Sequence, residues 1–418
     1  MVLGIGTSVI LARFLGPEGK GLYSLAVLLP TLIVTFMSLG IGPATVYHVA
    51  RKDFSPRVAF GNNLLFALVI GAVGVIAGVV LTVFFADKVF PGIPQNYLLF
   101  TLCLIPLKLL NAFFLYVHQG QQQFESHSLL VVLPSLFYLV FVVIGLILLR
   151  RGVFAAIIAV VASYLIVDLV HLRLVRGIPG GMCFTPDCAY IKAVLKYGWK
   201  AYLLTVVTFL NYRLDMLLVN GYLGAAAVGF YSVGVGLVEK LWLVPSALSM
   251  ALFPRLSAER DEERGRELAS FLARSTLWLT GIAASVLVLL CQPIIVLLYS
   301  EAYVPAVQAA QILLVGIVAL AGARPLINYL AGRGRPMLNT YAGIVALVMN
   351  LGLNIGLIPK LGITGAAWAS TVSYTVSYAF SIVAYCRISG SEWRDVVLLK
   401  RSDFTRYRAL IVRVIQRR

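Results

Sequence analysis

Residues 211–236 read NYRLDMLLVNGYLGAAAVGFYSVGVG, and the second half of this stretch repeats a pattern found near the N-terminus. The pattern is Leu-Gly-x4-Gly-x-Tyr-Ser, which begins at Leu223 and also at Leu15, 208 residues earlier. A second match, between residues 152–164 and 362–374, has nearly the same offset. Self-similarity at half the chain length indicates an internal duplication. Each copy is predicted to form a tight turn, marked by Gly16, Gly21, Tyr23, Gly224, Gly229 and Tyr231.

The composition is that of a membrane protein that crosses the bilayer many times. Hydrophobic residues make up 60% of the 418 residues, charged residues make up 12%, and the mean hydropathy is +0.93, which excludes a soluble protein. The net charge of +17 indicates basic cytoplasmic loops and not a nucleic-acid partner. The cysteines have no metal-binding or redox spacing, so no metal and no cofactor is predicted. No cleavable signal peptide is expected, because Met1 leads straight into apolar sequence.

Apolar runs predict an all-α polytopic fold of about twelve transmembrane helices. A helix needs about 20 apolar residues to cross the bilayer, and the first run is short because it would rise only about 22 Å. Each half holds six runs and returns to the side on which it began, so we expect two six-helix bundles related by a pseudo-twofold axis along the membrane normal. The predicted spans are residues 1–15, 22–50, 59–86, 97–117, 129–149, 152–172, 197–221, 228–253, 270–299, 306–330, 337–359 and 363–386.

The basic residues set the expected orientation in the membrane. Loops on the side of the N-terminus carry far more lysine and arginine than loops on the opposite side, so both termini are expected in the cytoplasm. The outer loops are too short for a catalytic domain, and no catalytic residue is predicted. The predicted parts are an N-terminal lobe (1–172), a cytoplasmic linker (173–196), a C-terminal lobe (197–386) and a basic cytoplasmic tail (387–418) against anionic lipid headgroups.

Charged residues inside the predicted spans are the candidates for a binding site, because a charge in the bilayer core is costly and is usually functional. Cations outnumber anions among them, and an unpaired cation in lipid needs a partner. An anionic substrate in a hydrated cavity is the simplest partner, and the planar fork of arginine suits phosphate. Structural ion pairs or snorkelling side chains are the alternative. The candidates are Arg213, Asp215, Lys108, Lys240, Glu239 and Arg324, with Asn111 one turn from Lys108 and Arg13 at the outer rim.

Three stretches carry a resemblance to a known family. Residues 12–26 read ARFLGPEGKGLYSLA, residues 212–215 read YRLD and lead to GFYS at 229–232, and residues 362–370 read GITGAAWAS. In this order and spacing they resemble the oligosaccharide flippases (polysaccharide transporters) of the multidrug/oligosaccharidyl-lipid/polysaccharide (MOP) exporter superfamily. The likeness runs over nearly the whole chain.

The resemblance implies a flippase and not an enzyme. Such a protein moves an undecaprenyl-diphosphate-linked oligosaccharide, the repeat unit of a polysaccharide, from the inner to the outer leaflet by alternating access through a cationic central cavity. It implies a bacterial or archaeal plasma (inner) membrane, and as partners the lipid-linked saccharide, membrane lipids and assembly proteins such as a polymerase and glycosyltransferases. Arg213 and Asp215 have only Ile5 and Thr7 at the matching positions of the first copy. We therefore expect a cavity in which charge is unevenly distributed between the two lobes, and in which the C-terminal lobe binds the diphosphate.

Three other classes of membrane protein are weighed against this one. A cation-coupled drug or small-molecule antiporter of the same superfamily would hold acidic residues in the N-terminal lobe, but no acid lies deep in the first six predicted spans, and Asp168 and His171 are expected at headgroup level. A major-facilitator transporter would have a basic, glycine-containing loop after the second span, which ARKDFSP at residues 50–56 lacks. A membrane glycosyltransferase or polysaccharide polymerase would need a large outer loop or several acidic residues on the outer side, and the short predicted outer loops provide neither.

Overall fold

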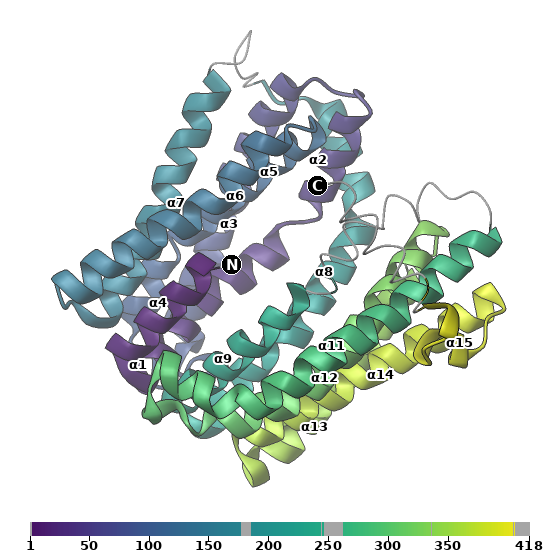
Figure 1. Ribbon diagram of the computed structural model, residues 1–418. Coiled ribbons are helices and arrows are strands. Elements are labelled where there is room, and N and C mark those ends of the chain that lie inside the picture. The colour runs from purple at the N-terminus through teal and green to yellow at the C-terminus, as the bar shows by residue number, and fades with distance from the viewer. Residues whose placement is uncertain are drawn as a thin grey trace, which may run out of the picture. The chain divides into compact units, whose positions relative to one another are not determined.

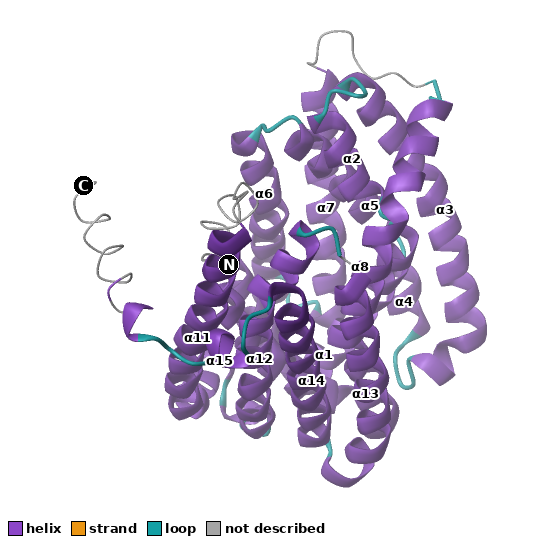
Figure 2. Ribbon diagram, turned by 90° about the vertical axis from the view of Figure 1, so that its right-hand side faces the viewer, coloured by secondary structure: helices purple, strands orange, loops and turns teal. Residues whose placement is uncertain are grey.

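The computed structural model shows a protein built from α-helices (Figure 1). It describes residues 2–176, 185–243, 245, 262–335, 337–403 and 405. These residues contain no β-strand (Figure 2), which confirms the predicted all-α polytopic fold. Nine of the described helices are long and apolar enough to cross a membrane. The predicted span at 228–253 lies partly outside the described residues.

The helices follow one another through short connections that carry recognisable start signals. Ser55 caps α3, its Oγ accepting from the Val58 amide, with Pro56 at the first helical position. Asp187 caps α8 by accepting the amides of Ala189 and Tyr190. In chain order the described elements are α1 (Val2–Met37), α2 (Ile41–Ala50), α3 (Pro56–Val89), α4 (Gln95–Thr101), α5 (Leu104–Gly120), α6 (Phe124–Val142), the π-helix η1 (Val143–Leu148), α7 (Gly152–Arg176), α8 (Cys188–Leu223), α9 (Ala225–Val238), the 3₁₀ turn η2 (Glu239–Trp242), α11 (Glu262–Tyr299), the 3₁₀ turn η3 (Glu301–Tyr303), α12 (Ala306–Gly332), α13 (Met337–Leu361), α14 (Ile363–Ser389) and α15 (Trp393–Val397).

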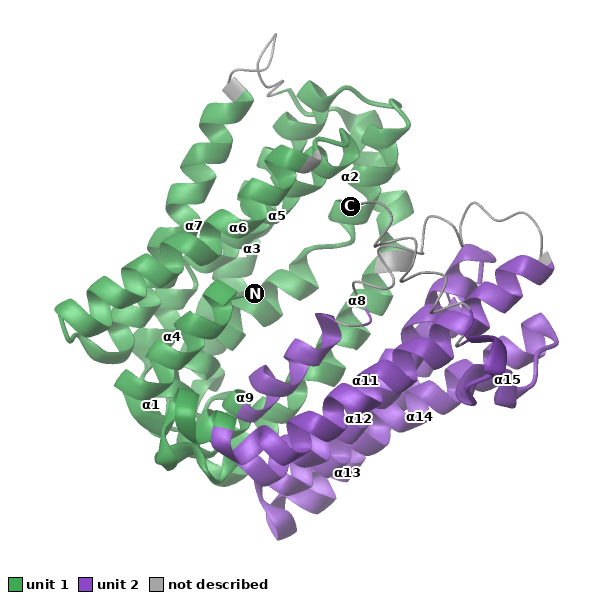
Figure 3. Cartoon of the chain, viewed as in Figure 1, with its two compact units in different colours: residues 1–233, 294–306 green, residues 234–293, 307–418 purple. Residues whose placement is uncertain are grey.

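The chain divides into two compact units (Figure 3). Unit 1 comprises Met1–Val233 and Ile294–Ala306, and unit 2 comprises Gly234–Pro293 and Val307–Arg418. These boundaries differ from those of the lobes proposed from sequence. The short segment around residue 300 belongs to unit 1 because it contacts α1: the Tyr303 hydroxyl donates to the Ala12 carbonyl at 3.1 Å.

Two glycines of the repeated pattern break the helices at matching positions. Gly16 interrupts α1 with φ 67° and ψ 178°, and Gly224 separates α8 from α9 with φ 81° and ψ 178°. A positive φ of this kind is open to glycine and unfavourable for other residues. The predicted turn in each copy is therefore confirmed, and the two copies share one backbone conformation. Gly152 and Gly362, from the second matched pair of stretches, also share a φ of 63°.

Within unit 1 the two copies of the turn pack directly against each other. A Cβ on Gly21 would lie 1.7 Å from the carbonyl oxygen of Ala225, and a Cβ on Gly229 would lie 1.9 Å from that of Pro17. The two contacts are equivalent under the repeat. Gly229 is the counterpart of Gly21 and Ala225 is the counterpart of Pro17, so each contact becomes the other when the two copies are exchanged. Contacts that exchange in this way are the mark of a twofold axis.

A pair of serines lies where that axis passes. Ser24 and Ser232 are counterparts 208 residues apart, and their Oγ atoms are 3.5 Å from each other. A residue meets its own counterpart only close to a twofold axis. A local pseudo-twofold axis therefore relates the two turns, and the duplication indicated by the sequence is visible as a physical contact.

Replacing Gly229 by alanine is expected to destabilise the protein, because the new Cβ would overlap backbone atoms of Pro17 that cannot rotate away. Overpacking of this kind costs about 1–3 kcal/mol or more. The measurement is the melting temperature of the purified protein in detergent. Gly221→Ala is the matched control, since nothing lies within 4 Å of a Cβ placed there. Equal melting temperatures for the two variants would contradict the close approach of the turns.

The described part of the C-terminal segment makes contacts within unit 2 that the sequence did not predict. It folds against α11 in unit 2, where the Trp278 indole donates to the Val397 carbonyl at 2.8 Å. Val396 and Asp403 are fully buried. The reason is that Asp403, a buried carboxylate of this segment, forms an ion pair with the buried Arg274 of α11, and this pair holds the segment in place. Residues 406–418 lie outside the described residues.

Candidate functional site

Lys108 is a half-buried cation without an acidic partner among the described residues. It projects from α5, and its ammonium donates to the Thr31 hydroxyl of α1 at 2.7 Å. It also lies 5.9 Å from the ring centroid of Tyr164 on α7. An ammonium has three N–H donors, and the contacts found within the described residues use only one of them in a hydrogen bond. Lys108 is therefore placed to bind an anion.

Asp215 is a buried carboxylate whose contacts tie it to the repeated turn. Its Oδ2 accepts from the Tyr231 hydroxyl at 2.6 Å and its Oδ1 accepts from the Met216 amide at 2.8 Å. In the first copy the counterpart of Tyr231 is Tyr23, which bonds the hydroxyl of Tyr138 instead. These contacts favour a structural role for Asp215 over direct binding of a substrate. The asymmetry between the copies follows, because Asp215 has no acidic counterpart.

Arg213 lies two residues before Asp215 on α8 and is half-buried. Two residues correspond to about 200° around a helix, so Arg213 and Asp215 project in different directions. Asp215 points to Tyr231 in the interior of unit 1. Arg213 stays a candidate ligand for an anion on the strength of its charge and partial burial.

Unit 2 holds the other charged candidates. Glu239 and Lys240 lie in η2 and are half-buried. Arg324 of α12 is also half-buried, and its guanidinium carbon lies 5.3 Å from the ring centroid of Trp242 in η2. Within the described ranges neither Lys240 nor Arg324 has a carboxylate partner. The structure thus brings together η2 and Arg324, which the sequence separates by about eighty residues.

Arg13 has a different environment from the one expected of a substrate ligand. It is exposed, and its Nε donates to the Leu298 carbonyl at 2.8 Å while a second nitrogen donates to the Leu297 carbonyl. These carbonyls belong to the last turn of α11, where backbone acceptors lack helical partners and a cation is stabilising. Arg13 therefore caps the end of α11 in unit 1.

Asp168 and His171 correct one expectation. They were expected at headgroup level, yet they are buried inside unit 1, with exposed fractions of 2% and 0%. His118 of α5 stacks on His171 with ring centroids 6.1 Å apart, and the buried Asn111 side chain interacts with Asp168. The reason is that α5 and α7 pack along this face and cover it. Asp168 is therefore an acid buried inside unit 1, a feature that its position along the predicted span did not reveal, and its i, i+3 spacing from His171 was the available signal.

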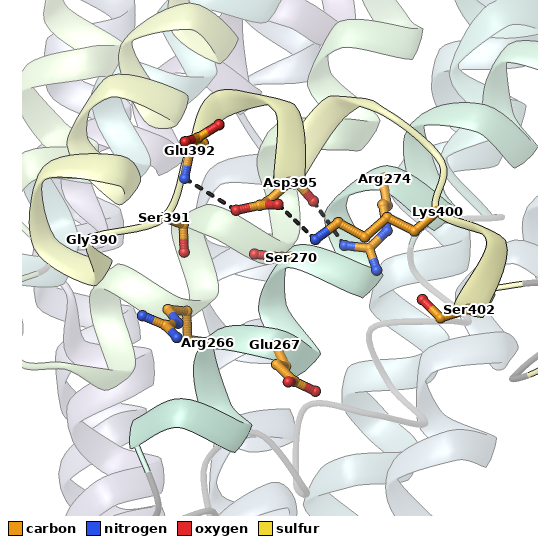
Figure 4. Close-up of a pocket in the computed structure, with 10 residues that line it drawn as sticks. All are labelled: Arg266, Glu267, Ser270, Arg274, Gly390, Ser391, Glu392, Asp395, Lys400 and Ser402. Atoms are coloured by element: carbon orange, nitrogen blue, oxygen red, sulfur yellow. Dashed lines mark hydrogen bonds and ion pairs between the residues drawn. The ribbon is translucent and has the colours of Figure 1, made fainter.

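A polar cavity of about 520 Å³ lies in unit 2, where α11, α14 and the C-terminal segment meet (Figure 4). Its lining mixes both signs of charge, including Arg266 and Arg274 from α11 and Asp395 and Lys400 from the C-terminal segment. The Lys400 ammonium lies 2.6 Å from the Asp395 carboxylate, and this hydrogen bond holds the pKa of Asp395 below its usual value. Since these charged side chains pair with one another, their ion pairs hold the walls of the cavity together.

The described residues contain no group of three or more His, Cys, Asp or Glu that could hold a metal ion. Buried or half-buried cations are instead spread over α5, α8, η2 and α12, on helices long enough to cross a membrane or on turns next to them. Many long apolar helices define a polytopic membrane protein, and charged side chains on them are candidates for a functional site. The fold is similar to that of two solved structures, one of them a transporter of the MOP superfamily, and 92–93% of the chain superposes on them.

The first of these structures is the lipid II flippase MurJ in an inward closed conformation, with a TM-score of 0.77 and 15% identity over 85% of that chain. The second is an inward-facing MATE family multidrug resistance transporter, with a TM-score of 0.70 and 16% identity over 94% of that chain. In sequence the chain is 24% identical, over 400 residues, to a putative O-antigen transporter of Shigella flexneri, covering 88% of this chain and 89% of the relative. The chain belongs to the family of polysaccharide biosynthesis proteins, which matches residues 10–308.

Proposed function

We propose that this MOP-family membrane flippase moves an undecaprenyl-diphosphate-linked oligosaccharide from the inner to the outer leaflet of a bacterial or archaeal plasma membrane. The observation that carries the proposal is Lys108, a half-buried ammonium whose hydrogen-bond partner in the described residues is a hydroxyl and not a carboxylate. A diphosphate supplies the missing negative charge. The O-antigen transporter among its relatives supports a saccharide as cargo.

Three further cations extend the same argument. Arg213, Lys240 and Arg324 are each half-buried on helices or turns of the fold. A guanidinium can bind two phosphate oxygens at once, whereas an ammonium acts as a point charge. We propose that these side chains and Lys108 contact the diphosphate at successive stages of an alternating-access cycle, with both termini in the cytoplasm. Glycosyltransferases would supply the substrate at the inner face and a polymerase would consume it at the outer face.

The alternative function is a cation-coupled drug antiporter of the same superfamily. One feature expected of such an antiporter is an acid inside the N-terminal half, and Asp168 is an acid buried there. The half-buried cations favour the flippase, because a cation such as Lys108 would repel a cationic drug at a place of low dielectric constant. A discriminating assay offers the protein an anionic lipid-linked saccharide and a cationic dye in parallel.

The direct test is the distribution of the lipid-linked saccharide between leaflets. Membranes depleted of this protein are expected to accumulate it on the inner leaflet, and purified protein in proteoliposomes is expected to restore exchange of an undecaprenyl-diphosphate-linked saccharide. An unchanged distribution after depletion, with no exchange in proteoliposomes, would reject the proposal. Export of the cationic dye alone would identify the antiporter.

A further inference from the structure

Two connections of unit 1 line a cavity of about 590 Å³. One connection follows α2 and the other follows α5, and these helices pack closely where they end: a Cβ on Gly120 would lie 2.8 Å from the Cβ of Val49. The volume lies within the range of about 300–1,000 Å³ that is typical of sites for small molecules. We call this cavity the turn pocket. Its polar and aromatic lining residues include Lys52, Phe54, Ser55, Gln121, Gln122 and Gln123.

The backbone of the two connections shares an unusual conformation. Lys52 is the second residue after α2 and Gln122 is the second residue after α5, and they have φ angles of 61° and 59°. Glycine is the usual residue at such a left-handed position beyond a helix end, because a side chain there is strained. Lys52 and Gln122 thus stand where glycine would be more stable, and both line the turn pocket. We therefore expect their side chains to have a role in the pocket.

A buried acceptor of the turn pocket has no hydrogen-bond partner among the described residues. It is the side-chain oxygen Oε1 of Gln121. Buried polar atoms are nearly always hydrogen-bonded, and exceptions in native structures call for an explanation. A ligand that carries hydroxyl groups would supply the missing donor. The exposed amide of Gln122, next to it, can both donate to and accept from the same kind of ligand.

An aromatic surface continues from the turn pocket toward the first turns of α8. Phe54 lines the pocket, and its ring centroid lies 5.8 Å from that of His48. The His48 ring lies 5.9 Å from that of Tyr197, which stacks on Tyr47 with centroids 4.2 Å apart. Tyr197 is 43% exposed, so this surface is open to a ligand. A carboxylate borders it, since Asp53 lies 2.9 Å from Nδ1 of His48.

We propose that the turn pocket and this aromatic surface bind the saccharide of the lipid-linked substrate before it crosses the membrane. A sugar ring carries C–H groups on its faces and hydroxyl groups around its edge, so it fits aromatic rings that are bordered by amides and charged side chains. The inference rests on the proposed function and on the orientation predicted from the basic residues, in which both connections are cytoplasmic. It assigns a place to the sugar, whereas the cations of the candidate site are proposed to contact the diphosphate.

The chemistry of the turn pocket argues against a second site for the diphosphate. Among the described residues that line it, Lys52 is the only cation, and the other polar side chains are amides and the hydroxyl of Ser55. A diphosphate is bound best by several charged donors, above all by the forks of arginine. Uncharged donors and acceptors beside aromatic rings instead suit a ligand that is rich in hydroxyl groups. The saccharide is the part of the substrate with that chemistry.

The test separates the sugar from the rest of the substrate by using two probes on the purified protein in nanodiscs. One probe is undecaprenyl diphosphate, and the other is the undecaprenyl-diphosphate-linked saccharide extracted from membranes of the source cell depleted of this protein. The wild type is expected to bind the saccharide-linked lipid several-fold more tightly. Gln122→Gly and Tyr197→Ala should each bring this ratio of affinities close to one without changing the affinity for undecaprenyl diphosphate. Tyr197→Phe keeps the ring and should keep the ratio.

The Gln122→Gly variant also distinguishes a binding role from a structural one. It relieves the strain of a left-handed glutamine, so its melting temperature should equal or exceed that of the wild type while saccharide binding falls. Arg150→Gly is the matched control, because Arg150 is exposed and has a φ of 51° in the connection at the far end of α6 and η1. This control should also keep or raise the melting temperature, and it should keep the ratio of affinities of the wild type.

Two results would overturn the inference. One is a wild type that binds both lipids equally, and the other is a ratio of affinities that stays unchanged in both Gln122→Gly and Tyr197→Ala. Flipping of the saccharide-linked lipid in proteoliposomes then shows which proposal has failed. Normal flipping by the wild type would leave the proposed function standing without a saccharide site in the turn pocket. A wild type that binds neither lipid and flips neither would reject both proposals.

Discussion

Replacement of Lys108 by methionine is expected to lower the initial rate of saccharide flipping by about tenfold or more, because a hydrogen bond to a charged group contributes about 1.5–3 kcal/mol and 1.4 kcal/mol corresponds to a factor of ten. The side chain of methionine keeps much of the volume between α1 and α7 and removes the charge. Lys108→Arg keeps the charge and should retain most of the activity. The measurement is the rate in proteoliposomes at equal protein density.

Lys88→Met is the matched control for this prediction. It also removes one lysine charge, but from an exposed side chain at the end of α3. Its flipping rate should match that of the wild type. Thr31→Val tests the position of the Lys108 ammonium, since it removes the hydroxyl that accepts from it, and a smaller loss is expected. If Lys108→Met flipped as fast as Lys88→Met, the cationic site would lose its main residue.

The fold was predictable because its signals are repeated and local. A long apolar run predicts a helix without knowledge of what packs against it, and two matches separated by nearly the same number of residues predict a duplication. The contact between Ser24 and Ser232 shows that the two copies of the turn are related by a local pseudo-twofold axis. Predicted span 1–15 corresponds to the part of α1 before Gly16, where the repeated pattern places the break, and predicted span 22–50 corresponds to the rest of α1 followed by α2.

For the candidate site, the sequence could predict only which charged residues lie in the spans. It could not predict which side chain or backbone group each of them contacts. Asp215 pairs with Tyr231 across a turn, and Arg13 caps a helix end nearly three hundred residues away. Asp168 was misplaced for the opposite reason: its distance along the helix indicated headgroups, whereas the packing of α5 over α7 buried it. Depth in a span and burial in a protein are separate quantities, and only the first can be read from an apolar run.

Truncation of Asp403 to alanine is expected to release the C-terminal segment from unit 2. The Asp403 carboxylate accepts two hydrogen bonds from the Arg274 guanidinium, at 2.5 and 2.6 Å, and both residues are buried. Arg274 also donates to the Asp395 carbonyl at 2.8 Å. Removing one partner of a buried ion pair costs about 3–5 kcal/mol, since the other charge is left without compensation.

A double-variant cycle separates the charge from the packing. Arg274→Met/Asp403→Leu replaces the pair by apolar side chains and should recover most of the stability lost by either single change, because an apolar pair needs no compensation. The measurements are limited proteolysis of the C-terminal segment and the fluorescence of Trp278, whose indole bonds the Val397 carbonyl. Asp395→Asn is the comparison, because its pair with Lys400 is half-exposed and such pairs contribute about 1 kcal/mol or less. If Asp403→Ala and Asp395→Asn were cleaved at the same rate, the buried pair would not be what holds the segment, and the cavity of Figure 4 would owe its shape to other contacts.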